Sequence, residues 1–263
     1  MGALGIVPYV ITNGLSLDAA RAAAWSRVHA HYRFSLQAGD PETWCRVHAG
    51  GTAGDFERVT AAMRFLAGSG KPHVSSLHVI HRQNYRAVRA MIEHARAVGI
   101  GHVIFRPVRA EGAIESVVLD EDEEAVLREE LLAALRLADE LGVETNIREY
   151  LADNLHVRSG LLDTTPVYAE TPCYVGWLYA EVGLDGAVVP CIGSQRAMGN
   201  AGEMPLREIW QSGQYRAFRR EARAMPGRGT PVEGCTCHAC PMYKYNVNMH
   251  AFLHGRWGRI SDA

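Results

Sequence analysis

The spacing of the cysteines constrains this chain of 263 residues more than any other feature, because five of the six lie between residues 173 and 240. Cys173 is followed by twelve residues, then Gly186, then four residues and Cys191. Apolar runs flank the turn signal Asp185-Gly186, which predicts a β-hairpin. Such a hairpin brings Cys173 and Cys191 to the same end.

The second group of cysteines is the sequence CTCHAC, which ends at Cys240. Cys237 and Cys240 offer two thiolates from one tight turn, a separation that suits a tetrahedral metal or an iron–sulfur cube. With the hairpin pair this makes four thiolates, enough to close one site. Cys235 is the alternative third ligand, and Cys45 stands alone as a packed or incidental thiol.

The four thiolates have three interpretations: an iron–sulfur cluster, a zinc ion, or thiols without a ligand. Zinc usually binds two close Cys-x2-Cys pairs, whereas Cys173 and Cys191 are separated by seventeen residues. Several close buried thiols without a metal or a disulfide are unusual. The pattern therefore favours iron–sulfur first and zinc second.

Composition limits the classes of function. A hydrophobic content of 48% allows a large core, and a formal net charge of -2 argues against a nucleic-acid surface. No apolar run approaches a membrane span, and the first residues lack the features of a signal peptide. We therefore expect a cytoplasmic protein with no nucleic-acid or membrane partner, in which clustered cysteines favour a metal over disulfides.

The first part of the chain alternates strands and helices. Buried strands are expected at residues 7–12, 32–36, 74–80, 102–106 and 143–148. Between them, apolar stripes predict helices, the first capped by Ser16 and running to about Ala30, the last capped by Asp120. Residues 37–54 are expected to be a polar loop. The connections are long enough for right-handed crossovers, which predicts a parallel sheet with helices on its outer face.

In parallel sheets the working residues gather at the carboxyl ends of the strands. Those ends carry Thr12, Asn13, Ser35, Gln37, His81, Asn84, Arg106 and Arg148.

The alternation stops at about Leu151, and we place the domain boundary between residues 160 and 161. Domain one is then 1–160 and domain two 161–263. After the hairpin, two short helices are expected at 205–212 and 214–224, followed by a loop rich in Gly and Pro. The basic run RAFRREAR is interpreted as a solvated helix face, and the tail from Tyr243 is not assigned.

Several of these motifs resemble a known family. The Cys-x12-Gly-x4-Cys block, the IWQSGQYRAFR helices and the last Cys-x-x-Cys resemble the auxiliary-cluster domain of radical S-adenosylmethionine enzymes, called SPASM or, in its shorter form, twitch. The segments ITNGLSLD, FSLQAGDPETW, HVIHRQN and VIFRPV resemble, in that order, the third to sixth strands of the enzyme core. The resemblance covers nearly the whole chain, and the cysteine block is its most specific part.

The resemblance implies an α/β fold: a partial (β/α) barrel of the radical S-adenosylmethionine type, missing its first strands, followed by a small SPASM/twitch-like domain. It implies that S-adenosylmethionine binds at the carboxyl ends of the strands, with contacts from Thr12, Ser35, Gln37, Asn84 and Arg106. It also implies one auxiliary [4Fe-4S] cluster, held by Cys173, Cys191, Cys237 and Cys240.

The chain departs from the family in one respect. None of its cysteines forms the Cys-x3-Cys-x2-Cys loop that holds the family's radical-generating cluster. We therefore expect a piece of an enzyme that would cleave S-adenosylmethionine reductively and abstract hydrogen from a peptide or a small metabolite. Its electron donor would be a protein such as flavodoxin or ferredoxin. The alternative is a non-enzymatic iron–sulfur or zinc protein that serves as an electron carrier or a partner subunit.

Overall fold

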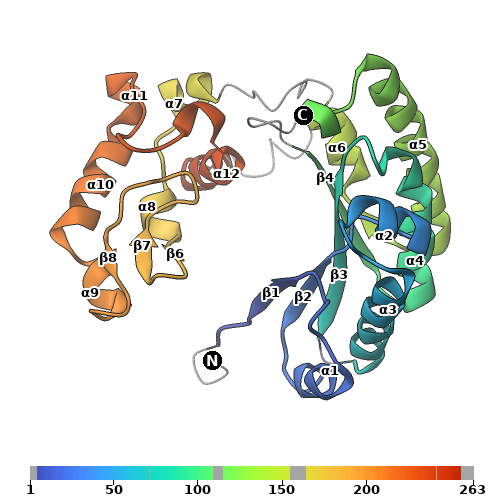
Figure 1. The fold of residues 1–263 in the computed structure, drawn as a ribbon. Coiled ribbons are helices and arrows are strands. Elements are labelled where there is room, and N and C mark those ends of the chain that lie inside the picture. The colour runs from blue at the N-terminus through green and yellow to red at the C-terminus, as the bar shows by residue number, and fades with distance from the viewer. Residues whose placement is uncertain (1–4, 71, 109–114, 155–163, 241, 256–263) are drawn as a thin grey trace. The chain divides into compact units, whose positions relative to one another are not determined.

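The structure, a computed structural model, describes residues 5–70, 72–108, 115–154, 164–240 and 242–255. The chain forms two compact units, Met1–Gly160 and Leu161–Ala263 (Figure 1).

Unit 1 alternates strands and helices. Its strands are β1 (Tyr9–Thr12), β2 (His31–Ser35), β3 (His73–Ile80), β4 (His102–Pro107) and β5 (Glu144–Thr145). Its α-helices are α1 (Ala19–Trp25), α2 (Pro41–Val47), α3 (Ala53–Gly68), α4 (Val88–Val98), α5 (Glu121–Leu141) and α6 (Ile147–Asn154). Two 3-10 turns are η2 (Tyr85–Ala87) and η3 (Glu115–Val117).

The five strands form one parallel sheet in the order β1-β2-β3-β4-β5, which confirms the predicted α/β class. Strands β1 and β5 are its two edges. The sheet follows chain order because each crossover helix returns the chain beside the strand that it has just left.

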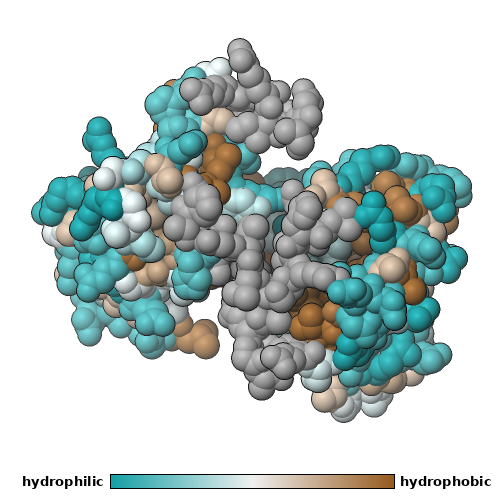
Figure 2. All heavy atoms as spheres, turned by 90° about the horizontal axis from the view of Figure 1, so that it is seen from above, coloured by the Kyte–Doolittle hydropathy of each residue, from teal (hydrophilic) through white to brown (hydrophobic). Residues whose placement is uncertain are grey.

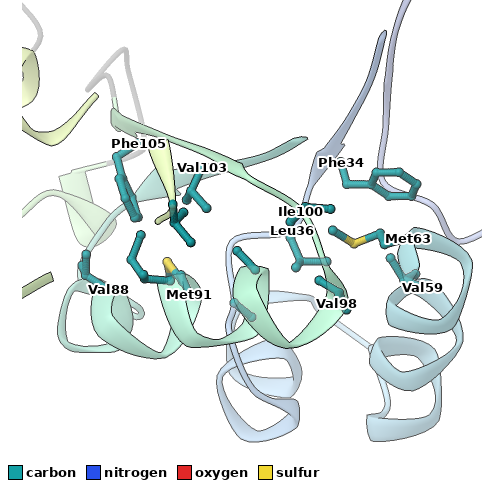
Figure 3. Close-up of a cluster of buried hydrophobic side chains, with 14 of the residues drawn as sticks. Phe34, Leu36, Val59, Met63, Val88, Met91, Val98, Ile100, Val103 and Phe105 are labelled. Atoms are coloured by element: carbon teal, nitrogen blue, oxygen red, sulfur yellow. The ribbon is translucent and has the colours of Figure 1, made fainter. Parts of the chain in front are cut away.

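One face of the sheet packs on the helices. Phe34, Val103 and Phe105 point from the strands toward apolar side chains of α3 and α4 (Figure 3). The residues that share this buried core in Figure 3 are Phe34, Leu36, Val59, Met63, Val88, Met91, Val98, Ile100, Val103 and Phe105. The stripes at helical spacing thus mark the inward face of each helix correctly.

Two expectations for the first part of unit 1 are wrong. Helix α1 is capped by Asp18, whose side chain accepts the Arg21 N–H at 2.8 Å, and not by Ser16. The expected loop contains helix α2, capped by Asp40 with Pro41 in its first turn. Asp followed by Pro is a helix-start signal that the polar composition of this segment hides.

The fifth strand is also shorter than expected. Strand β5 covers only Glu144–Thr145, and helix α6 begins at Ile147. Asn146 ends the strand because its side chain bonds the backbone of Phe105 on both sides, donating to the carbonyl at 3.0 Å and accepting from the N–H at 2.8 Å. Arg148 therefore lies in a helix and not at a strand end.

Unit 2 is built from short elements. Its helices are α7 (Thr165–Glu170), α8 (Val175–Leu178), α9 (Leu206–Trp210), α10 (Gly213–Arg223), α11 (Met225–Arg228) and α12 (Tyr243–Leu253), with a 3-10 turn η5 (Cys237–Ala239). Its strands are β6 (Glu181–Val182), β7 (Ala187–Val189) and β8 (Gly199–Asn200). The unassigned tail thus contains helix α12, and the loop rich in Gly and Pro contains α11.

The predicted hairpin is present. Strands β6 and β7 pair antiparallel, and β8 adds a third strand on the far side of β7. Gly186 takes φ 82°, the left-handed conformation that favours glycine at this turn. Asn200 braces the turn by donating to the Asp185 carbonyl at 3.0 Å.

Hydrophilic side chains dominate the face drawn in Figure 2, and the hydrophobic ones form separate spots. Among the described residues, no helix combines the length and the apolar character that a membrane crossing needs.

The helical side of the sheet buries a titratable group. His94 lies in α4, and its Nε2 is 2.9 Å from the Thr60 hydroxyl of α3. Burial lowers the pKa of His94 to about 4; the nearby Arg64 lowers it further, and Asp40 partly opposes the shift. Because the unfolded chain binds this proton near pH 6.5, the folded state is penalised once the pH falls below that value.

We predict that the unfolding free energy of His94→Gln falls less steeply with decreasing pH than that of the unchanged chain. Above about pH 6.5 His94 is neutral in both states; between about 6.5 and 4, its contribution to the unfolding free energy falls by up to about 1.4 kcal/mol per pH unit. Urea unfolding followed by circular dichroism at several pH values would show a smaller slope in the variant. The exposed His29→Gln is the control and keeps the original slope. Parallel slopes for His94→Gln and the unchanged chain would contradict the prediction.

Candidate metal centre

The core of unit 2 gathers the cysteines that the sequence singles out. Cys173, Cys191, Cys237 and Cys240 are all buried in it, and Cys235 packs against it partly exposed. The thiols of all five are free. Segments that are far apart in the sequence therefore deliver four buried thiols to one place.

Backbone hydrogen bonds join the loop after Cys191 to the loop before Cys237. The Thr236 N–H donates to the Gly193 carbonyl at 2.9 Å, and the Gln195 N–H donates to the Gly234 carbonyl at 2.9 Å. Ser194 and Cys235 form an isolated antiparallel bridge between these two bonds. This short ladder, and not the hairpin alone, holds the two groups of cysteines side by side.

Thr164 fixes the last Cys-x-x-Cys turn. Its hydroxyl donates to the Cys237 carbonyl and accepts from the Cys240 N–H at 3.0 Å, while its own N–H donates to the His238 carbonyl at 2.8 Å. Thr164 is buried, so all of these bonds are shielded from water. The residue thus closes the turn from a position more than seventy residues earlier in the chain.

Three of the sulfur atoms accept a backbone hydrogen bond from the second residue after the cysteine. Val175 bonds Cys173, the Gly193 N–H is 3.4 Å from Cys191 Sγ, and the Met242 N–H is 3.4 Å from Cys240 Sγ. The backbone of Val232 bonds the fourth sulfur, that of Cys237. Cys240 Sγ also accepts from the Tyr168 hydroxyl at 2.9 Å. Donors aimed at sulfur stabilise the thiolate, which is the form that binds metal.

In the absence of a metal, the pKa values follow from burial and from contacts between thiols. Burial raises the pKa of Cys173 to about 12 and that of Cys191 to about 11. A hydrogen bond between Cys235 and Cys237 lowers the pKa of Cys235 and raises that of Cys237. The thiols of Cys173 and Cys191 are therefore protonated at neutral pH, and metal loading must release protons.

The spread of the cysteines bears on the kind of metal that they could bind. Within the described ranges, no three His, Cys, Asp or Glu side chains converge closely enough to hold one metal ion. Cys173, Cys191 and Cys240 nevertheless belong to one buried core. A cube of iron and sulfide is wider than a zinc ion and binds thiolates that stand further apart.

Arg196 and Arg219 connect the segments that surround the cysteines. Arg196 forms a bidentate ion pair with Glu221, at 2.7 and 3.2 Å, and so ties the loop after Cys191 to α10. Arg219 donates to the carbonyls of Gly176 at 2.7 Å and Trp210 at 2.9 Å. The basic run in α10 is therefore not simply a solvated face, because Arg219 points inward and caps two helices.

The strand-end residues of unit 1 lie on both faces of the sheet. Ser35 and Arg106 alternate with the buried Phe34 and Phe105, so they point to the face opposite the helices. Thr12 pairs in register with Phe34 and points to the helical side. Its hydroxyl accepts the Gly14 N–H at 3.0 Å.

Gln37 and Asn84 meet at the carboxyl edge of the sheet. Gln37 has φ 51°, the one positive value among the described residues other than glycine. Asn84 is buried and donates to the carbonyls of Gln37 at 3.0 Å and Val79 at 2.9 Å, while its oxygen accepts the His81 N–H at 2.8 Å. The Asn84 side chain therefore joins two loops, and backbone strain of this kind at Gln37 is common at functional sites.

Sequence reasoning missed three residues at the centre: Thr164, Tyr168 and Asn246. Thr164 and Tyr168 precede the first cysteine of the block, and Asn246 lies in the tail that was left unassigned. No local pattern marks a threonine or tyrosine that acts on a turn some seventy residues away. Only a helical assignment of the tail could have brought Asn246 under consideration.

The structure therefore combines a parallel α/β unit with a second unit whose core buries four thiols. Residues 173–241 match the SPASM family, described as an iron-sulfur cluster-binding domain. A curated relative, the PqqA peptide cyclase of Granulibacter bethesdensis (strain ATCC BAA-1260 / CGDNIH1), is 27% identical over 248 residues, which are 88% of this chain and 62% of that protein.

Solved structures share the fold. Streptococcus suis SuiB bound to S-adenosylmethionine matches 89% of this chain and 56% of its own, with a TM-score of 0.59 and 15% identity. The enzyme anSMEcpe with bound AdoMet and the Cp18Cys peptide matches 95% of this chain and 74% of its own, with a TM-score of 0.56 and 14% identity. The comparisons thus identify a SPASM domain at residues 173–241, and the rest of the chain is similar to radical S-adenosylmethionine proteins that carry such a domain. It spans about three fifths of the length of the curated relative.

We predict that Thr164→Val loosens the Cys-x-x-Cys turn. The variant keeps the shape of the side chain but leaves the buried Cys240 N–H without an acceptor, which costs about 1–3 kcal/mol of unfolding free energy. Urea unfolding of the metal-free chain, followed by tryptophan fluorescence, measures this loss. Thr236→Val is the matched control, because the exposed Thr236 hydroxyl makes only a 3.3 Å bond to the Gly193 carbonyl. Equal losses in the two variants would contradict the role given to Thr164.

Proposed function

We propose that this chain is part of a radical S-adenosylmethionine enzyme that modifies a peptide. In this proposal, unit 2 holds one auxiliary [4Fe-4S] cluster on Cys173, Cys191, Cys237 and Cys240. The observation that carries it is the buried core that these four thiols share, in which each sulfur accepts a backbone hydrogen bond.

The residues of unit 2 supply three things to such a cluster. The four thiols bind it, the apolar core around them excludes water, and the N–H groups of Gly193 and Met242 offset the negative charge of the sulfurs. When bound, the cluster supplies one-electron transfer. Cys235 lies at the rim, partly exposed, and is the alternative to Cys237.

The peptide substrate is inferred from the relatives. The curated relative is named for cyclising the peptide PqqA. The structure of SuiB bound to its precursor peptide SuiA matches this chain with a TM-score of 0.56. Ser35, Gln37 and Arg106 at the carboxyl edge of the sheet are proposed contacts of S-adenosylmethionine, with Thr12 and Asn84 as supports of the adjoining loops. A flavodoxin or ferredoxin is the proposed electron donor.

The residues present do not fit the radical-generating cluster. The chain's six cysteines include no Cys-x3-Cys-x2-Cys loop, so no step of S-adenosylmethionine cleavage is derived from these residues. This observation favours a second candidate function for the chain by itself: a protein that binds an iron–sulfur cluster and passes electrons without radical chemistry.

We predict that anaerobic reconstitution with iron and sulfide gives about four iron atoms per chain and a broad absorbance near about 400 nm. Alanine at Cys173, Cys191, Cys237 or Cys240 lowers the iron content sharply. Cys235→Ala and the exposed Cys45→Ala keep it. Zinc in place of iron in the purified protein, with no sulfide uptake, would reject the cluster in favour of a single ion.

We also predict that the reconstituted chain alone forms no 5′-deoxyadenosine from S-adenosylmethionine under dithionite, because it lacks the loop that binds the radical-generating cluster. Chromatography of the reaction mixture measures the product, and a complete radical S-adenosylmethionine enzyme is the positive control. Catalytic formation of 5′-deoxyadenosine by this chain would show that the radical centre is built in another way.

A further inference from the structure

The Tyr168 hydroxyl is a side-chain donor to the sulfur of Cys240, one of the four proposed ligands. Tyr168 lies in α7, is buried, and donates to Cys240 Sγ at 2.9 Å. The Gly193 and Met242 donors come from the backbone and follow from local turn geometry. The Tyr168 bond differs because it reaches the sulfur from a separate helix, 72 residues away in the sequence.

Asn246 fixes the direction of this bond. Its Nδ2 donates to the Tyr168 hydroxyl oxygen at 3.0 Å, and its Oδ1 accepts the Tyr174 N–H at 2.7 Å. The backbone N–H of Tyr174 thus determines which end of the amide faces the phenol. Because the phenol oxygen already accepts from Asn246, its own hydrogen points to the sulfur. Asn246 is fully buried, so water does not compete for these bonds.

A hydrogen bond to sulfur acts differently on the two redox states of a cluster. Reduction adds one electron, and part of the added charge resides on the cysteine sulfurs, where a donor stabilises it. Burial strengthens the effect because hydrogen bonds to charged groups are stronger in a site shielded from water. A donor lost from this position therefore makes reduction less favourable.

We propose that Tyr168, oriented by Asn246, is a positioning residue that raises the reduction potential of the cluster held by Cys240. The inference rests on the proposed function, because it requires the cluster to bind at these cysteines. In the redox step one electron arrives from the external donor, no bond forms or breaks, and the phenol keeps its proton. Tyr168 thus sets how readily unit 2 accepts an electron.

The test is a redox titration of the reconstituted full chain, followed by electron paramagnetic resonance of the reduced cluster. Tyr168→Phe keeps the ring and removes the donor. At the potential where half of the original clusters are reduced, we expect the ratio of reduced to oxidised cluster in the variant to be lower by about threefold or more. Tyr215→Phe is the matched control, because Tyr215 is buried in the same core and its hydroxyl bonds the Tyr179 carbonyl instead of a cysteine.

A second replacement tests the proposal if the Tyr168→Phe variant does not bind a cluster. Replacing Tyr168 by 3,5-difluorotyrosine leaves the hydroxyl in place and makes it a stronger donor, so the potential should move upward. Unchanged potentials in both replacements, or an equal shift in Tyr215→Phe, would overturn the role of Tyr168 alone. Failure of the unsubstituted chain to take up iron and sulfide would instead overturn the proposed function, and this inference with it.

Discussion

The burial of four thiols in a unit made of short elements is the constraint on which unit 2 depends. Its helices and strands are too short to be stable alone, and Cys173, Cys191, Cys237 and Cys240 belong to the core that its described residues share. Protonated thiols are small hydrophobic groups, so the core can pack without a metal. Binding of a cluster would then add its free energy directly to the stability of this unit.

The bonds around the cysteines come from several parts of the chain. The ladder beside Cys235 joins two loops, Thr164 closes the Cys-x-x-Cys turn, and Asn246 links α12 to Tyr168. The bonds of Thr164 and Asn246 satisfy buried polar groups, which would be costly to leave without a partner. The same bonds also place donors near the sulfurs, so in our proposal they would both stabilise the unit and affect the electronic properties of a bound cluster.

Unit 1 follows a different physical logic, in which the sheet and its helices are stabilised by apolar packing on one face. The strand-end residues then divide by the alternation of the strands: Ser35 and Arg106 point away from the helices, and Thr12 points toward them. The side-chain amide of Asn84 forms its hydrogen bonds with backbone groups and so supports the loop that contains Gln37. The sequence alone indicates that these residues lie at one edge of the sheet. The register of the strands is needed to tell which side chains point away from the helices and which support loops.

The sequence by itself determined the parallel α/β unit, the hairpin and the set of cysteines, because strand and helix periodicity, the Asp-Gly turn and the cysteine spacing are local signals. Three features differ from the sequence prediction: the residue that caps α1, the presence of α2 in a polar segment, and the length of β5. Strand β5 is shorter because Asn146 bonds Phe105 of the neighbouring strand. Only the tertiary structure decided that Thr164, Tyr168 and Asn246 meet the cysteine turn. Hydrogen bonds between residues some seventy positions apart leave no periodic trace in a sequence, since nothing local depends on them.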